Sequence, residues 1–578
     1  MTYVPPLRDL AFSLDHLAEA GRLKELLAGY DDDTQSAVLD AAGRFARDVL
    51  APLNRIGDET GARYLNGTVQ AAPGFAQAYR TFAEAGWNGL AAPVDFGGQG
   101  LPRALSLAVF EMLHSANMAF GLCPMLTQAA IEVLCAYGSD RQRSLYLGKL
   151  VSGAWTGTMN LTEPQAGSDL ASVRLRAEPD GDGRYRLSGQ KIFITWGDHD
   201  MSENIVHLVL ARVAGAPEGT KGLSLFLVPK RRVNDDGSLS AANAVSAMRI
   251  EEKLGIHGSP TCTMLYDGAD AELVGAPNQG LALMFTMMNA ARLQVGVEGV
   301  AIAERAYQQA LAFARERRQG RSVWTGEYPA PIVDHPDVRR MLALMKARIE
   351  AARGLCLATG VAADLARAGD ERARLREELF TPIAKAWSTD MGVEVASLGV
   401  QMHGGMGYIE ETGAAQHYRD ARITPIYEGT NGIQAIDLVG RKLALADGAA
   451  LSDLFADIRA TIAAIDTLPG VAARLSDAVV AAETATAWLR ETQRANPASP
   501  LAGATPCLTL LGDTIGGWML AKGALAAARS RDSSSPTRAA LARFYAGHVL
   551  ARTPGIAAAA MAGDDDLRSL TPDVLTTA

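Results

Sequence analysis

One carboxylate stands alone in the segment ITPIYEGTNGIQ, which spans residues 423–434. Apolar residues and a proline precede Glu428, and small turn-forming residues follow it. Burial in such a setting disfavours the charged carboxylate and raises its pKa toward the range of a general base. The main-chain N–H groups that follow could donate to a substrate carbonyl. The alternative, equally supported by this segment alone, is a glutamate that caps the helix predicted from residue 427 onward.

Two further segments offer groups suited to a flat polar ligand. MNLTEPQAGSDL, residues 159–170, places Thr162, Gly167 and Ser168 near a tight backbone, where hydroxyl and N–H groups can approach a polar ring. In KIFITWGDHD, residues 191–200, Phe193 and Thr195 alternate along a predicted strand and therefore share a face. Taken singly, each segment is better explained without a ligand, as a Ser turn and as a core Phe beside a surface Thr.

A glycine-rich segment, QMHGGMGYIEE at residues 401–411, could bring main chain close to a pyrophosphate. It lacks the glycine spacing and the preceding strand of a Rossmann fingerprint, and we find no such fingerprint elsewhere in the sequence. His403 has no second metal-type residue at suitable spacing, so we interpret it as a packing or hydrogen-bonding residue and expect no metal site.

These segments need several domains to position them, because a chain of 578 residues exceeds the size of a single core. Helical periodicity, β-rich runs separated by turn formers, and renewed helical periodicity follow in that order. The last stretch is helical and Ala-rich, with breaks at NPASP and SSSP. The predicted fold is mostly α with a central β domain: an N-terminal extension (1–31), a helical domain (32–154), a middle β domain (155–280), a helical bundle with Glu428 (281–445) and an additional C-terminal helical domain (446–578).

Composition makes several classes of function poor first guesses. The net charge is -9 and no basic block is long enough to follow a phosphate backbone, which argues against nucleic acid. The five cysteines form no CxxC pair, so a reducing compartment fits. The first residues show no signal peptide, and no long uncharged apolar run suggests a membrane span. We expect a cytoplasmic protein.

In combination the segments are far more specific. The order LTEPQAGSD, GQKIFIT, QMHGGMGY and RDARITPIYEGTNGIQ strongly resembles the acyl-CoA dehydrogenase family, over roughly residues 32–445. The flanking segments YVPPLRDLAFSL, EEKLGIHGSPTC, LYDGADAELVG and MFTMMNAARLQVG, with the C-terminal extension, resemble the branch that contains 3-methylmercaptopropionyl-CoA dehydrogenase.

The resemblance implies a fold of N-terminal helices, a β-barrel-like middle domain and a helical bundle, with FAD between the β and helical domains. It implies oxidation of an acyl-CoA thioester to the trans-2-enoyl-CoA. Glu428 would remove the α proton while the β hydrogen leaves as hydride to flavin N5, and its own main-chain N–H, with a flavin ribityl hydroxyl, would polarise the thioester carbonyl. Some relatives place the base on the helix near Arg292, but here no Asp or Glu lies between Glu272 and Glu298.

Other roles carry over residue by residue from the same resemblance. Those implied to contact FAD are Leu161, Thr162, Gly167, Ser168, Phe193, Thr195 and Thr430, and, toward the neighbouring subunit's FAD, Arg317, Gln401 and Gly405. Those implied to contact substrate are Ser168, Asn289, Arg292, Glu428 and Gly429. The chain departs from common family residues in having Phe193 for Trp and Asn289 for Asp, and the sequence RRQGRS lacks a Phe that usually follows Arg317.

Two alternatives remain open at this point. An acyl-CoA oxidase would pass electrons to oxygen, whereas a dehydrogenase would pass them to an electron-transferring flavoprotein, and the motifs do not separate the two. A family member without dehydrogenation, serving in assembly or DNA protection, fits less well because charges after Gly448 are nearly balanced and Glu428 is retained. We expect a homodimer, because the C-terminal helices would cover the surface through which shorter relatives pair two dimers. The acyl chain is left open between a short thioether-bearing group and straight chains of other lengths.

Overall fold

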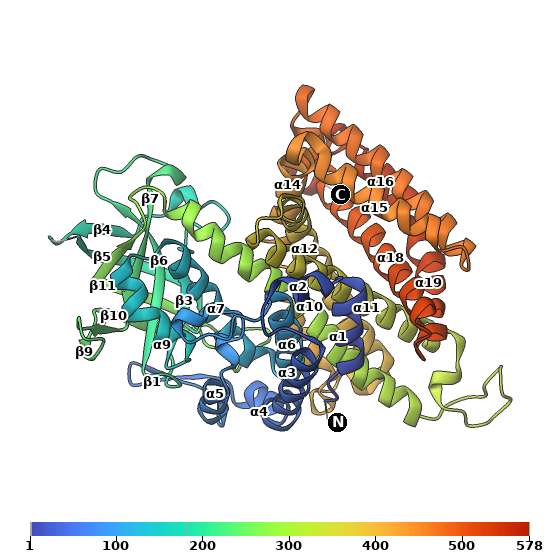
Figure 1. The fold of residues 1–578 in the computed structure, drawn as a ribbon, viewed down its shortest axis with the longest axis horizontal. Helices are drawn as coiled ribbons and strands as arrows, with labels where there is room; N and C mark the ends of the chain where they lie inside the picture. The colour runs from blue at the N-terminus through green and yellow to red at the C-terminus, as the bar shows by residue number, and fades with distance from the viewer. Residues whose placement is uncertain (1–2, 182, 577–578) are drawn as a thin grey trace.

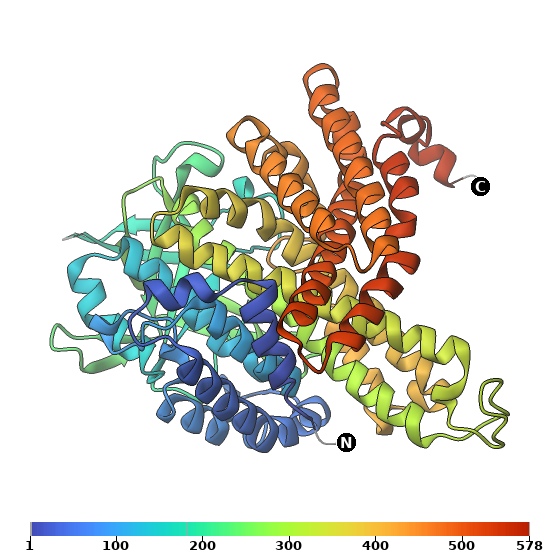
Figure 2. The same cartoon turned by 45° about the vertical axis from the view of Figure 1, so that its right-hand side comes forward.

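The computed structural model describes residues 3–181 and 183–576 and confirms the predicted fold class. The β domain lies at one end of the molecule, long helices form the middle, and the C-terminal helices stand at the other end (Figure 1). The N-terminal residues, in α1 (Leu7–Phe12) and α2 (Gly21–Leu26), pack against the central helices (Figure 2).

The N-terminal helices surround an apolar core. Their bounds are α3 (Asp32–Phe45), α4 (Ala51–Thr60), α5 (Phe75–Glu84), α6 (Arg103–Ala116), α7 (Met118–Tyr137), α8 (Asp140–Gln142) and α9 (Gly148–Val151), with a short hairpin of β1 (Arg63–Leu65) and β2 (Thr68–Gln70). Helix α7 is long and apolar enough to cross a membrane by length and composition, although no such span was expected from the sequence. It lies buried against α10 and β3, which is typical of the core helix of a folded domain.

The β domain closes into a barrel-like ring. Its strands are β3 (Trp155–Asn160), β4 (Arg176–Pro179), β5 (Arg184–Thr195), β6 (Asn204–Val213), β7 (Leu223–Pro229), β8 (Arg231–Val233), β9 (Leu239–Ala242), β10 (Val245–Ile250) and β11 (Thr261–Val274). The main sheet runs in the order β10-β11-β5-β4-β6-β3, and β7 pairs with both β11 and β6. That double pairing closes the sheet around a core of its own.

The helical bundle consists of α10 (Gly280–Glu316), α11 (Pro336–Arg367), α12 (Glu371–Met402), α13 (Ala414–Ala421) and α14 (Asn431–Gly440). A buried arginine joins it to the N-terminal helices: Arg353 on α11 donates to Glu111 on α6 and to Glu304 on α10. Because each charge is paired and hydrogen-bonded, this cluster fixes how the helices meet in an otherwise apolar interior.

The C-terminal helices are α15 (Ala449–Ala464), α16 (Pro469–Ala495), α17 (Ala498–Ala502), α18 (Ala504–Ser530), α19 (Ser535–His548), α20 (Thr553–Ala560), α21 (Asp565–Ser569) and α22 (Pro572–Thr576). The breaks between α16 and α18 and between α18 and α19 fall at NPASP and SSSP, as predicted. Helix α18 packs on α11 and α12, where the indole N–H of Trp387 donates to Asp513 at 3.0 Å. The C-terminal helices therefore cover one face of the bundle.

Candidate active site

Glu428 lies in the connection between α13 and α14, at a turn with unusual main-chain geometry. Glu428 has φ +56° and Gly429 has φ +83°. Left-handed backbone costs little at glycine but is strained at glutamate, and such strain concentrates at functional sites. The helix cap is Thr430, whose hydroxyl accepts from the N–H of Ile433 at 3.2 Å. The capping alternative for Glu428 is therefore wrong, and its carboxylate is not used to start the helix.

The turn is held through its main-chain carbonyls. Arg292 Nε donates to the carbonyl of Glu428 at 3.3 Å, while its Nη1 donates to Asn289 Oδ1 at 3.3 Å. Arg292 is almost fully buried, and Asn289 is exposed on the same helix. The structure thus brings Arg292, Asn289, Glu428 and Gly429 together.

A buried lysine that sequence reasoning missed holds the next carbonyl. Lys385 Nζ donates to the Gly429 carbonyl and to Asn431 Oδ1, both at 2.9 Å. Asn431 in turn donates to Thr389 and Asp390 on α12. The available signal was one lysine in the apolar run FTPIAKAW, since a lysine is almost never fully buried without partners.

Burial and two nearby cations act in opposite directions on the Glu428 carboxyl. Burial raises the pKa of the Glu428 carboxyl to about 7, opposed by the positive charges of Arg292 and Lys385. Burial also lowers the pKa of Lys385 to about 8, opposed by Glu428 and Asp390. The residue as a whole is half-buried.

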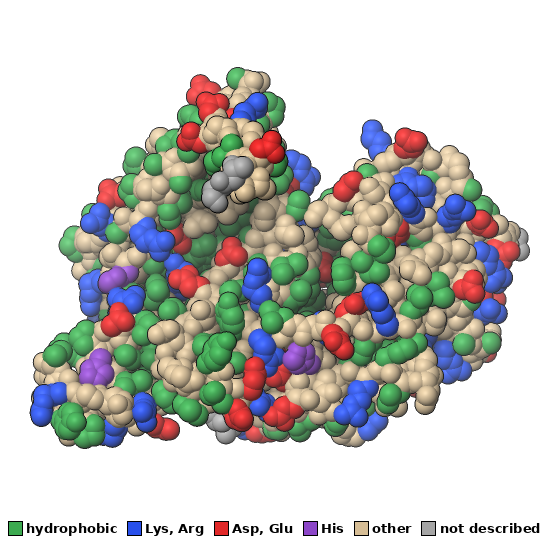
Figure 3. Space-filling view, turned by 180° about the vertical axis from the view of Figure 1, so that it is seen from behind, with side chains coloured by type: hydrophobic (Ala, Val, Ile, Leu, Met, Phe, Trp, Pro, Cys, Tyr) green, Lys and Arg blue, Asp and Glu red, His purple; other side chains and the backbone are tan. Residues whose placement is uncertain are grey.

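A cleft of about 330 Å³ lies between the β domain and the bundle, and its lining ends at Tyr427, the residue before Glu428. Phe193 and Thr195 line it from β5, and Ile423, Ile426 and Tyr427 line it from the segment that leads to Glu428. From behind, the surface is hollowed between the C-terminal helices and the β domain, with hydrophobic side chains along part of the hollow (Figure 3).

A β-bulge sets the position of Phe193. Ile192 and Phe193 together oppose Thr263 of β11, and Phe193 has φ +59°. Phe193 and Thr195 do share the cleft, but the bulge, rather than regular strand alternation, turns the ring outward so that it is 60% exposed. An apolar ring of this size left open to solvent on a cleft wall suits stacking on a flat ligand.

A buried ion pair, also missed from the sequence, anchors the neighbouring loop. Lys191 Nζ donates to Glu163 Oε1 and to the Leu161 carbonyl, both at 2.8 Å, and the N–H of Ile192 donates to the Thr162 carbonyl at 2.9 Å. Leu161 and Thr162 are thereby held beside Phe193. Gly167 and Ser168 lie exposed farther along the loop, and a Cβ at Gly167 would meet nothing within 4 Å. The loop has room for a ligand to approach its main chain.

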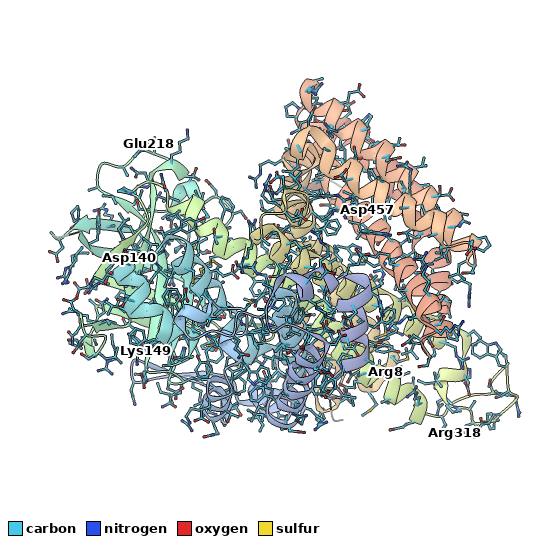
Figure 4. All side chains as sticks on the ribbon, viewed as in Figure 1. Arg8, Asp140, Lys149, Glu218, Arg318 and Asp457 are labelled. Carbon is cyan, nitrogen blue, oxygen red and sulfur yellow. The ribbon has the colours of Figure 1, made fainter. Side chains whose placement is uncertain are left out.

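The other predicted residues lie elsewhere. Arg317 follows the C-terminal end of α10, about 38 Å along the helix from Arg292 at 1.5 Å per residue. Gln401 and Gly405 are exposed near it, where His403 packs on Phe313 with ring centroids 4.5 Å apart. Figure 4 shows Arg318 at the opposite end of the molecule from Asp140 and Glu218. One chain therefore does not bring Arg317, Gln401 and Gly405 to Glu428.

Models of the acyl-CoA dehydrogenase N-terminal, middle and C-terminal domains match residues 32–154, 158–269 and 278–444. A relative from Ruegeria pomeroyi, named 3-methylmercaptopropionyl-CoA dehydrogenase, is 50% identical over 91% of this chain and 92% of its own length. The chain belongs to the acyl-CoA dehydrogenase family. Residues 454–571 match a fourth model, acetyl-CoA dehydrogenase C-terminal like.

Solved structures of the family share the fold. Caenorhabditis elegans ACDH-11, in complex with C11-CoA, has a TM-score of 0.79 at 23% identity and covers 95% of this chain and 92% of its own. An acyl-CoA dehydrogenase from Bacillus anthracis, complexed with FAD, has a TM-score of 0.75 at 19% identity and covers 94% of this chain and 90% of its own. Both matches extend over the C-terminal helices, so the whole architecture recurs in this enzyme family.

We expect Lys385→Met to lower kcat by about tenfold to hundredfold with little change in KM, because a catalytic group displaced by about 1 Å loses activity on that scale. Lys442→Met is the matched control, since Lys442 is a partly buried lysine that pairs with Glu378 and does not touch the turn. Steady-state kinetics of both variants decide the point. Equal kcat values for the two would show that Lys385 does not position Glu428.

Proposed function

We propose that this enzyme catalyses FAD-dependent α,β-dehydrogenation of a short acyl-CoA thioester, with Glu428 as the base. The observation that carries the proposal is the Glu428 turn: a carboxyl with a pKa of about 7 in a left-handed turn. The turn directly follows Tyr427, which lines a cleft that also has the exposed Phe193 ring. A pKa near the working pH gives a base that is both deprotonated and strong enough to take a proton.

The α proton of a thioester becomes acidic only when its carbonyl is polarised. The main-chain N–H of Glu428 donates no hydrogen bond to any other residue of the described chain, although the turn around it is well bonded. A fixed N–H beside the base suits the oxygen on which negative charge develops. Glu428 therefore supplies both groups, with Arg292 and Lys385 holding the main chain that aims them.

The cleft residues fit the isoalloxazine ring of FAD. The Phe193 ring offers a stacking face and Thr195 a hydroxyl on the same wall. The Leu161–Ser168 loop beside them has open main chain at Gly167, and Thr430 begins a helix whose N-terminus faces the turn. When bound, FAD supplies the hydride acceptor, and the protein contributes its position and the proton transfer.

The substrate proposal is 3-methylmercaptopropionyl-CoA or another short or medium acyl-CoA. It is supported by the name of the Ruegeria relative, whose identity of 50% extends over nearly the whole chain. The polar CoA part would lie at the exposed Asn289 end of α10 and near Ser168, and the thioester between Arg292, Gly429 and Glu428.

We also propose a cytoplasmic homodimer that passes electrons to an electron-transferring flavoprotein. The distance along α10 supports two subunits, because Arg317, Gln401 and Gly405 could contact FAD only if it were bound by a neighbouring chain. Reoxidation in the presence and absence of oxygen distinguishes this acceptor from the oxidase alternative.

In an anaerobic titration we expect 3-methylmercaptopropionyl-CoA to bleach the flavin absorbance of the wild type, and Glu428→Gln to abolish the bleaching while flavin stays bound. The amide keeps the size of the side chain but cannot accept the α proton. Glu411→Gln, an exposed acid in the loop before α13, is the control and should bleach normally. Bound flavin that no acyl-CoA from short to long bleaches would refute the proposed reaction.

The pH dependence should reflect the same group. Since Glu428 acts deprotonated and its pKa is raised to about 7, kcat/KM should rise about tenfold per pH unit below pH 7 and level off above it. At higher pH, Lys385 loses its charge near its pKa of about 8, and kcat/KM should fall again. Initial rates between pH 5 and 9 test this, and a rising limb centred near pH 4.5, the ordinary glutamate value, would contradict the raised pKa.

Light scattering should give a homodimer of the 61.0 kDa chain. Helix α18 covers α11 and α12, so that this face of the bundle is not free to pair two dimers. A tetramer in solution would contradict this account of the C-terminal helices.

A further inference from the structure

A buried polar cluster lies behind the wall of the cleft. Tyr427 lines the cleft, and its hydroxyl donates to Glu298 Oε2 on α10. On the far side, Glu298 Oε1 is 3.9 Å from Nε2 of His114 on α6. Glu298 and His114 are 0% and 1% exposed, so the three side chains form a closed inner end next to the proposed base.

The cluster has hydrogen-bonding capacity that the protein does not use. Within the described residues, Glu298 Oε1 lacks a hydrogen-bond partner. Buried polar atoms nearly always have partners, so unpartnered ones mark a place where a ligand or water supplies them. Helix α7 leaves room for the His114 ring at Gly121. A Cβ at that position would lie 2.5 Å from His114 Nδ1, so a larger residue would displace the ring.

The cluster is uncharged at neutral pH. Burial raises the pKa of Glu298 to about 8, aided by the nearby Glu428, and burial lowers the pKa of His114 to about 3. Glu298 is then a carboxylic acid. With Oε2 accepting from Tyr427, its proton lies on Oε1 and makes a neutral, unused donor.

The depth of the cluster fits the end of a short acyl chain. Along α10, Asn289 is exposed, Arg292 is 6% exposed and Glu298 is 0% exposed. A thioester whose polar CoA part stays at the exposed end must point its acyl group inward along this helix. Glu298 lies six residues beyond Arg292, about 9 Å along the helix, so an acyl group that reaches from one to the other is short.

We propose that Glu298, Tyr427 and His114 form the inner end of the acyl pocket and select a short, neutral acyl group that ends in a weak hydrogen-bond acceptor, such as a thioether. The inference rests on the proposed dehydrogenation. A thioether sulfur accepts weakly from the Glu298 hydroxyl, whereas a methylene in its place leaves that donor unpartnered. A longer hydrocarbon would have to displace the cluster, and a charged tail would be buried without a counterion.

The test uses a matched pair of substrates, 3-methylmercaptopropionyl-CoA and pentanoyl-CoA, which have equal chain lengths and differ by sulfur for methylene. The wild type should prefer the thioether in kcat/KM by about twofold to tenfold, the range of a net hydrogen bond. Octanoyl-CoA should be at least about tenfold poorer than pentanoyl-CoA, as for extra methylenes that do not fit a pocket.

Two substitutions of Glu298 distinguish the effect of its hydrogen-bond donor from the effect of its side-chain volume. Glu298→Ala removes both the donor and the wall, so the thioether preference should disappear and octanoyl-CoA should improve by about tenfold relative to pentanoyl-CoA. Glu298→Gln keeps the volume and an N–H donor, so it should keep the chain-length limit and most of the preference. Flavin content and the thermal midpoint show whether each variant is folded.

His114→Ala removes a side chain of α6 from the inner end of the proposed acyl pocket and leaves Tyr427 and Glu428 unchanged. If Glu298→Ala does not fold, the same substrate ratios are measured with His114→Ala. Unchanged substrate ratios in the folded variants, with an active wild type, would overturn the selection role and leave the proposed dehydrogenation standing. A wild type that oxidises no acyl-CoA would overturn the proposed function itself.

Discussion

The site depends on a strained two-residue turn that is held by its main chain. Glu428 and Gly429 both have positive φ, and their carbonyls accept from Arg292 and Lys385, two buried cations on different helices. Because these bonds end on carbonyls and not on the carboxylate, the Glu428 side chain stays free and its pKa stays high. A direct ion pair would have lowered that pKa and removed the basicity that the site needs.

A similar arrangement, in which buried pairs hold the main chain and other groups stay free, occurs on the β-domain wall of the cleft. The ion pair between Lys191 and Glu163 is buried and ties the Leu161 carbonyl in place, whereas the exposed Phe193 ring and Thr195 hydroxyl are left for a ligand. The bulge that turns Phe193 outward is strained as well. Phe193 thus faces the cleft and Glu428 directly follows a residue that lines it, and hydrogen-bonded neighbours support each of these two strained residues.

The helices outside the site fix where the two halves of the cleft meet. Arg353 joins α6, α10 and α11 inside the bundle, and Arg538 on α19 donates to Glu350 on α11 and to Asp9 on α1. The C-terminal helices are therefore bonded to the N-terminal extension and to α11, which Arg353 joins to α10, the helix that carries Arg292 and Glu298. Helix α10 has the proposed substrate contacts near one end and Arg317 just beyond the other.

The sequence by itself determined the order of the helical and β regions and the C-terminal breaks, because these follow from local periodicity and turn residues. Motif order singled out Glu428 as the proposed base. It did not reveal Lys385, Lys191, Glu163 or the Glu298 cluster. In the sequence each of these looks like an ordinary charged residue, because its partner comes from a distant segment. Lys385, for example, donates to the carbonyl of Gly429, which lies 44 positions later in the chain. Only the tertiary structure decided that Thr430, not Glu428, caps α14, and that a bulge turns Phe193 into the cleft. Burial and long-range hydrogen bonds set these features, and neither can be read from local sequence.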